Sequence, residues 1–328
     1  MKRISSFLFF VLACGASGPN GPTSPSGPVG EPTAESAATK PAATKPAPKA
    51  ATAEQVAHRV LILDGHIDVP WRLEKSTNAD GTLGEEISEA TESGDFDYPR
   101  AKTGGLDAPF MSIYVSPKFE KRGAKKVADD LIDMVEGIAK RAPDKFALAP
   151  TVASVRANFA AGRISLPMGM ENGAPIEGEL ANVAYFHRRG IRYITLAHSE
   201  DNHIADSSYD TRHTHHGLSE FGTRVVHEMN RVGIMIDVSH ISDEAFDDVM
   251  ASTAVPVIAS HSSCRHFTPG WERNMSDAMI RRLAENGGVI QINFGSSFLD
   301  GDIREGREAQ QEALKRHLTA KKLDPDSE

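Results

Sequence analysis

From residue 61 onward, short apolar runs alternate with longer amphipathic stretches, and this alternation restricts the possible folds more than any other feature of the sequence. Strands that alternate with helices along a chain pair as parallel strands through helical crossovers, so the sequence predicts an α/β fold with a parallel sheet. The expected strands are 61–67, 109–115, 165–170, 191–197, 233–239, 255–260 and 288–294. The expected helices are 123–140, 151–161, 178–189, 217–231, 242–252 and 275–286.

Seven strands in strict alternation favour a (β/α)8 TIM-type barrel over a doubly wound dinucleotide-binding sheet. No GxGxxG motif follows the first expected strand, which also argues against dinucleotide binding. After Phe298 the sequence continues as a charged, helical stretch, and we find no eighth strand. We therefore expect a barrel that is truncated after its seventh strand, with two unpaired edge strands.

The first 52 residues have a different character. Residues 1–13 combine a basic start with a short apolar stretch, as in a secretory signal peptide, and Ala13-Cys14 resembles a bacterial lipidation site. Residues 14–52 are rich in Pro, Ala, Gly, Ser and Thr and predict a disordered tether. We expect an exported lipoprotein, anchored to a bacterial membrane through Cys14 and facing the periplasm or exterior. The alternative is a plain signal peptide with an incidental cysteine.

The remaining residues, 53–328, are expected to form one folded domain. A hydrophobic content of 40% is sufficient for a sizeable core, and the net charge of -9 argues against a nucleic-acid partner. A homodimer is compatible with the sequence.

Ligand-type side chains follow several of the expected strands. His66 and Asp68 end the first strand, Glu171 follows the third, and three histidines follow the next three strands: His198, His240 and His261. The carboxyl ends of barrel strands meet at one mouth, where imidazole and carboxylate groups together suit zinc and similar divalent ions. Taken singly, a histidine that follows a strand is more often a hydrogen-bonded loop residue than a metal ligand. We interpret the cluster at His213, His215 and His216 as a solvated loop.

Six blocks of the sequence resemble, in order, those of the membrane (renal-type) dipeptidase family: DGHIDVPW, GMENGAPI, RGIRYITLAHSEDNHIADSS, GIMIDVSHIS, PVIASHSS and TPGWERNMSD. The resemblance extends over residues 60 to 300. It implies a (β/α)8 barrel that holds two Zn2+ ions, although other divalent ions would also fit, and that hydrolyses dipeptides by a metal-bridging hydroxide.

The resemblance also implies roles for individual residues. His66 and Asp68 would bind one zinc, His240 and His261 would bind the other, and Glu171 would bridge both as a catalytic residue. His198 would contact the substrate and stabilise the oxyanion, and Arg273 would bind the substrate's C-terminal carboxylate. For Arg273 the alternative is a surface ion pair with Glu272 or Asp277. Independently of the resemblance, Asp237 and Ser239 precede His240 in the expected strand, and we expect them to orient His240 or, alternatively, to pack in the barrel layers.

One block of the family has no counterpart in the sequence. In the family, the eighth strand ends in a block like GSDFDG, whose first aspartate contacts the substrate's amino group. Two alternatives to a dipeptidase therefore remain open. The first is a catalytically impaired or silent, metal-binding lipoprotein of the same fold, and the second is a metal-dependent amidohydrolase that acts on another carboxylate-bearing amide.

Overall fold

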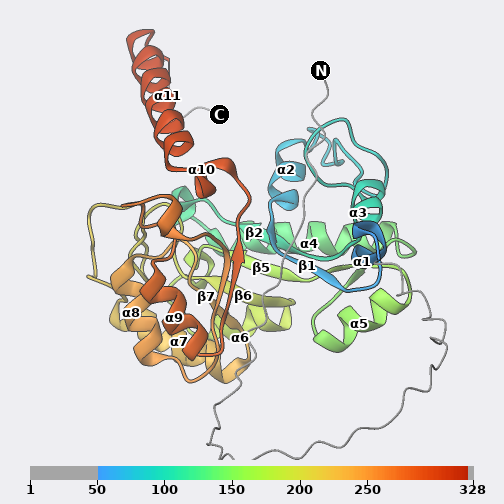
Figure 1. The fold of residues 1–328 in the computed structure, drawn as a ribbon, viewed down its shortest axis with the longest axis horizontal. Helices are drawn as coiled ribbons and strands as arrows, with labels where there is room; N and C mark the ends of the chain where they lie inside the picture. Colours follow the sequence, from blue (N-terminus) through green and yellow to red (C-terminus); the bar gives the residue numbers. More distant parts are fainter. Residues whose placement is uncertain (1–50, 324–328) are drawn as a thin grey trace, which may run out of the picture.

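A computed structural model describes residues 51–323 of the chain. Seven parallel strands form one curved sheet that nearly closes into a barrel, in the order β1-β2-β5-β6-β7-β8-β9 (Figure 1). The strands of this sheet are β1 (Ile62–Ile67), β2 (Leu106–Tyr114), β5 (Met168–Glu171), β6 (Ile191–Thr195), β7 (Met235–Asp237), β8 (Ile258–Ser262) and β9 (Val289–Ile292). The structure thus confirms the TIM-like α/β architecture expected from the sequence.

Most of the helices cover the outside of this sheet and connect its strands, whereas α10 and α11 follow the last strand, β9, and α11 projects away from the sheet (Figure 1). The α-helices are α1 (Ala53–Ala57), α2 (Val69–Lys75), α3 (Tyr98–Gly104), α4 (Ala124–Arg141), α5 (Val152–Ala160), α6 (Ala181–Arg188), α7 (Glu220–Val232), α8 (Asp243–Ser252), α9 (Asp277–Glu285), α10 (Ser296–Leu299) and α11 (Gly301–Ala320). Three of the connecting helices, α7, α8 and α9, begin after a serine whose hydroxyl accepts a hydrogen bond from a backbone N–H of the first turn. These serines explain why the three helix starts expected from the sequence agree with the observed starts to within a few residues.

The expected strand 165–170 is divided in two. Pro167 has no backbone N–H and lies between β4 (Ile164–Leu166) and β5. The short strand β4 pairs with β3 (Phe146–Leu148) in a separate two-stranded sheet, which the sequence analysis missed, whereas β5 pairs with β2 and β6 in the barrel. The expected helix 178–189 begins later, at Ala181, after a 3-10 turn at Ala174–Ile176.

The two edges of the seven-stranded sheet are β1 and β9, which do not pair with each other. They nevertheless approach closely, because a Cβ atom at Gly65 in β1 would lie 2.7 Å from the side chain of Gln291 in β9. The same Cβ would lie 2.3 Å from the backbone oxygen of Ser260 in β8. A residue without a side chain is therefore required where β1 meets β8 and β9.

Within residues 51–323, no helix is both long and apolar enough to cross a membrane. The expected signal peptide, the lipidation site at Cys14 and most of the expected tether lie outside the described residues.

The close approach at Gly65 predicts the effect of one substitution. We expect Gly65→Ala to reduce the free energy of unfolding by about 1–3 kcal/mol, because the added methyl group overlaps backbone and has no space to move into. Urea unfolding followed by circular dichroism measures this change. The matched control is Gly104→Ala, where an added Cβ would meet nothing within 4 Å. Equal stability of the two variants would contradict the prediction.

Candidate metal centre

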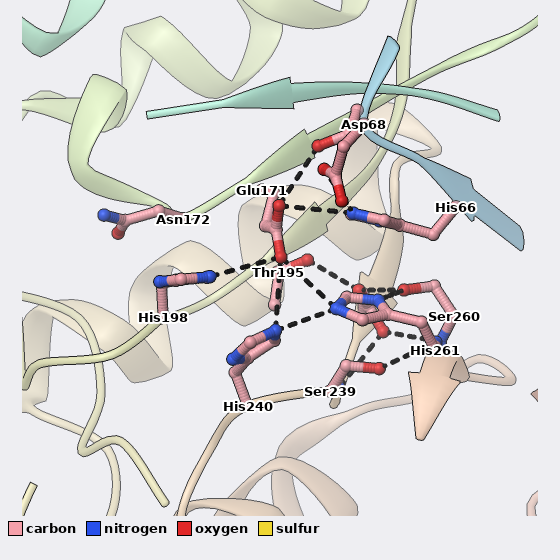
Figure 2. Close-up of polar contacts among 12 residues, drawn as sticks. His66, Asp68, Glu171, Asn172, Thr195, His198, Ser239, His240, Ser260 and His261 are labelled. Atoms are coloured by element: carbon pink, nitrogen blue, oxygen red, sulfur yellow. Dashed lines mark hydrogen bonds and ion pairs between the residues drawn. The ribbon is translucent and has the colours of Figure 1, made fainter. Parts of the chain in front are cut away.

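Five strands bring the six ligand-type side chains of the sequence analysis together (Figure 2). His66 is in β1 and Asp68 follows it, Glu171 ends β5, and His261 is in β8. His198 and His240 lie in the loops that follow β6 and β7. Because all the strands are parallel, their carboxyl ends meet at one mouth, and residues up to 195 positions apart in the sequence become neighbours.

The carboxylate of Glu171 lies at the middle of the group and is only 4% exposed. Its Oε2 atom is 3.2 Å from Nε2 of His66 and accepts a hydrogen bond from the Ser112 hydroxyl. Its Oε1 atom is 3.1 Å from Nε2 of His240 and 3.2 Å from Nε2 of His261. The two carboxylate oxygens therefore face two different sets of nitrogen atoms, as a bridging ligand requires.

Asp68 completes the group on the side of His66. It occupies the N-cap position of α2, yet its side chain caps no backbone N–H. Instead its Oδ1 atom lies 3.2 Å from Nε2 of His66, and the side chain remains 62% exposed at the mouth.

The spacing of these donor atoms fits a divalent ion. A tetrahedral zinc ion with ligand bonds of about 2.0–2.1 Å holds its ligand atoms about 3.3 Å apart. Most of the distances given above are 3.1–3.2 Å, and the Nε2 atoms of His240 and His261 are 2.8 Å apart. Nitrogen and carboxylate donors that converge this closely suit zinc or a similar ion, so the residues present fit the metal that the sequence suggests.

His198 belongs to the same cluster. Its Nε2 atom is 3.4 Å from Oε1 of Glu171, and its ring stacks on the ring of His240 with centroids 4.3 Å apart. Judged by distance alone, the ligand atoms form two overlapping groups, one of His66, Glu171 and His261 and the other of Glu171, His198 and His240. Glu171 is common to both groups, as it is in the arrangement expected from the sequence.

Burial and charge set the protonation states in this cluster. Burial raises the pKa of Glu171, but the charge on His66 and the polar contacts with His198, His240 and His261 hold that pKa well below its usual range. Burial and the Arg273 charge hold the pKa of His240 well below its usual range. Burial, His66 and Arg273 lower the pKa of His261 to about 4. Glu171 is therefore ionised and these two histidines are neutral near pH 7, which are the states that bind a metal ion.

The pKa of His66 shifts in the opposite direction from those of His240 and His261. Burial lowers its pKa, but Tyr193 and the Glu171 carboxylate outweigh burial and raise the pKa well above its usual value.

Two residues of the centre have left-handed backbone conformations. His240 has a φ of 71° and Asn172, directly after Glu171, has a φ of 81°. Such conformations are costly outside glycine and persist only where other contacts fix them. Asn172 is fixed by its own amide, which donates to the Val115 carbonyl and accepts from the Asn202 amide. These left-handed conformations change the direction of the chain after β5 and β7, where Glu171 and His240 enter the cluster.

Arg273 lies beside the cluster and is 2% exposed. Its guanidinium donates to the hydroxyl of Ser262 and to the backbone oxygen of His261, and its Nε atom has no partner. Among the described residues, no carboxylate forms an ion pair with Arg273. The alternative of a surface ion pair with Glu272 or Asp277 is therefore wrong.

One further expectation needs correction. Asp237 and Ser239 do not contact the His240 ring: Asp237 accepts a hydrogen bond from Ser260, which contacts His261, and the Ser239 hydroxyl accepts one from the His261 backbone. The loop at His213, His215 and His216 is exposed or half-buried, as expected, and the ring of His215 contacts the backbone oxygen of Asn202. Sequence reasoning had also missed Ser112 and Tyr193, because hydroxyls within apolar strands carry no distinctive pattern.

Comparison with known proteins relates this geometry to a family. The sequence model described as membrane dipeptidase (peptidase family M19) matches residues 50–320. Dipeptidase tcpJ of Claviceps purpurea is 34% identical over 62% of this chain and 49% of its own length. Dipeptidase aclJ of Aspergillus oryzae is 35% identical over 73% of this chain and 58% of its own length. The chain thus spans about half the length of the curated relatives it matches.

Among solved structures, a metallopeptidase from Rhodobacter sphaeroides is similar in fold. Its TM-score is 0.66 and it is 28% identical, over 74% of this chain and 76% of that chain. That structure holds a phosphinate mimic of the dipeptide L-Ala-D-Ala.

The pKa shifts predict how the stability of the metal-free protein depends on pH. Between about pH 6.5 and pH 4, the unfolded chain binds protons at His240 and His261 that the folded chain does not bind. Each such proton makes the free energy of unfolding fall by up to about 1.4 kcal/mol for each pH unit of acidification. His66 stays protonated in the folded state, and the unfolded chain also protonates it as the pH falls below about 6.5, so His66 adds little slope over most of this range.

We therefore expect urea unfolding of the EDTA-treated protein to show stability falling steadily from pH 6.5 to pH 4. His261→Gln should reduce the slope, whereas His58→Gln, at an exposed position, should not change it. A flat profile for the unsubstituted protein would contradict the prediction.

Proposed function

Because the chain belongs to the membrane dipeptidase family, peptidase family M19, we propose that it is a metal-dependent dipeptidase. Its substrates are dipeptides with a free C-terminal carboxylate, and its cofactor is two zinc ions for each chain. The dipeptidases and metallopeptidase to which the chain is similar support this proposal.

The observation that carries the choice of substrate is the buried Arg273. A guanidinium withdrawn from water without a carboxylate partner is costly, and a charged ligand that enters the site would offset this cost. Its backbone contact with His261 fixes it beside the centre, and its Nε atom remains unpartnered. A planar guanidinium binds a carboxylate through two parallel hydrogen bonds, which suits the free end of a dipeptide.

The residues that would hold the ions are His66 and Asp68 for one, His240 and His261 for the other, and Glu171 for both. Bound divalent ions of this kind supply an activated water molecule and polarise the carbonyl group that is attacked. The ionised carboxylate of Glu171 offsets part of the positive charge, and the neutral rings of His240 and His261 leave their nitrogen lone pairs available.

His198 is the residue we assign to the substrate oxyanion. Its ring lies between those of Tyr114 and His240, with centroid distances of 4.7 and 4.3 Å, and these contacts restrict its orientation at the mouth. An N–H of a ring held in this way needs little reorganisation to donate to an oxygen that gains charge during hydrolysis.

Two other functions are tested together with this one. A silent metal-binding protein of the same fold would bind zinc and hydrolyse nothing. An amidohydrolase for acyl amino acids would also use Arg273, but it would accept substrates without a free amino group.

We also propose that the protein is exported and held at a bacterial membrane, facing the periplasm or exterior, through a lipid on Cys14. Dipeptides and a second copy of the chain are its proposed partners, and nucleic acid is not among them. The support comes from the sequence of the first 52 residues and the acidic composition.

The role of Glu171 is tested by Glu171→Gln, which keeps the shape of the side chain and removes its charge. We expect bound zinc to fall from two ions to at most one for each chain, and hydrolysis of alanyl-alanine to fall at least 1000-fold, on the order expected for loss of a metal ligand's charge stabilisation. Glu179→Gln, at an exposed position in the next turn of chain, is the matched control. Hydrolysis by Glu171→Gln with two bound ions would overturn the proposed centre. Two bound ions without hydrolysis by the unsubstituted chain would instead favour the silent protein.

The role of Arg273 is tested by changing the substrate as well as the protein. We expect kcat/KM for alanyl-alanine to exceed that for its C-terminal amide by about 10- to 100-fold, the value of a hydrogen bond to a charged group. In Arg273→Gln this preference should disappear, whereas Arg282→Gln, at a surface ion pair with Asp247, should keep it. Equal rates for acid and amide in the unsubstituted chain would contradict the assignment. Faster hydrolysis of N-acetylalanine than of alanyl-alanine would favour the amidohydrolase.

A further inference from the structure

We propose that Tyr193 and Ser260 are positioning residues that keep the proton of two imidazoles, His66 and His261, on Nδ1 and direct each Nε2 lone pair into the centre. This inference rests on the proposed metal site. Neither residue would touch the ions or the substrate, and each acts through the histidine that it holds.

The first hydrogen-bond relay runs from Gly65 through Tyr193 to His66. The Tyr193 hydroxyl donates to the backbone oxygen of Gly65 at 3.1 Å and lies 2.8 Å from Nδ1 of His66. A carbonyl oxygen only accepts, so the hydroxyl proton of Tyr193 points to Gly65, and its oxygen must accept from the imidazole. Nδ1 of His66 therefore carries a proton, and Nε2 is the nitrogen that faces Glu171.

The second relay runs from Asp237 through Ser260 to His261. Figure 2 shows Ser260 beside His261. The Ser260 hydroxyl donates to Oδ2 of Asp237 at 2.6 Å and lies 2.7 Å from Nδ1 of His261. Asp237 also accepts from the Thr195 hydroxyl and from the backbone N–H groups of Ser239 and Ser260. With its own proton committed to the carboxylate, Ser260 can only accept from His261, which again leaves Nε2 facing the centre.

Burial makes both relays specific. Tyr193 and Asp237 are fully buried and Ser260 is 2% exposed, so water does not compete for these hydrogen bonds. The sequence also provides the space that Tyr193 needs. Gly169 in β5 is its neighbour across the sheet, and a Cβ at Gly169 would lie 2.0 Å from the Tyr193 ring.

The other two imidazoles of the cluster lack such support. The Nδ1 atoms of His198 and His240 are buried and have no hydrogen-bond partner among the described residues. The two relays therefore serve His66 and His261, which the proposed arrangement assigns to different ions. Each half of the centre would contain one imidazole that is oriented before an ion binds. Partners of this kind on metal-binding histidines raise affinity by 10- to 100-fold.

The first test measures zinc affinity of the full chain by competition with a chromophoric chelator. We expect Ser260→Ala and Tyr193→Phe each to weaken the binding of one zinc ion about 10- to 100-fold. The matched controls remove hydroxyls that also form hydrogen bonds but lie elsewhere: Ser165→Ala, buried beside Asn158, and Tyr185→Phe, which donates to Asp129. Zinc affinity in the two relay variants equal to that of the controls would overturn the proposal.

The second test reads the proton positions directly and needs no substitution. In the zinc-loaded chain labelled with 15N-histidine, we expect slowly exchanging Nδ1–H signals from His66 and His261, the former with a nuclear Overhauser effect to the Tyr193 ring. Zinc bound through Nδ1 of either histidine would overturn the proposal, even if both variants failed to fold.

The two tests are independent of peptidase activity. A chain that binds zinc with both relays formed, but that hydrolyses no dipeptide, would contradict the proposed function and leave the relays supported. A chain that binds no zinc would contradict the metal centre itself, and with it the relays.

Discussion

The buried carboxylate of Glu171, surrounded by four imidazoles, is the constraint on which the rest of the centre depends. A carboxylate at this depth is tolerated only when charge and hydrogen bonds compensate for lost water. Here His66 supplies charge and Ser112 supplies a hydrogen bond. The imidazole nitrogens and carboxylate oxygens that converge here are donors suited to a divalent cation. The groups that compensate for the burial of Glu171 therefore also suit a bound ion.

The fold satisfies this constraint by placing small residues where strands and rings must approach. Gly65 lets β1 come within contact of β8 and β9, and Gly169 leaves room for the Tyr193 ring inside the sheet. Each glycine therefore acts on the centre indirectly. Gly65 sets the position of the strand that carries His66, and Gly169 sets the position of the hydroxyl that holds its ring.

The sequence predicted the barrel strands and most helices well, because their apolar runs are long and their helix starts carry serine caps. It also predicted that the ligand-type residues meet at one mouth of the barrel, because the carboxyl ends of parallel strands all lie there. It missed β3, whose short apolar run before Pro150 is equally typical of a loop, and it did not show that Pro167 divides an apolar run between two sheets. The partner of Asp237 was wrong for a different reason. Which histidine it serves depends on the register between β7 and β8, and that register joins residues distant in sequence.

The proposed metal ligands are divided between strands inside the sheet and one strand at its edge. Glu171 and His261 lie in β5 and β8, and His240 follows β7, so all three are placed by strands with neighbours on both sides. His66 is carried by β1, an edge strand that pairs only with β2. The Tyr193 hydroxyl, which donates to Gly65 and accepts from His66, is thus a second attachment of this edge to the sheet. Loosening of β1 would remove His66 and Asp68 while leaving the other half of the centre in place, so the two proposed ion sites depend on different parts of the fold.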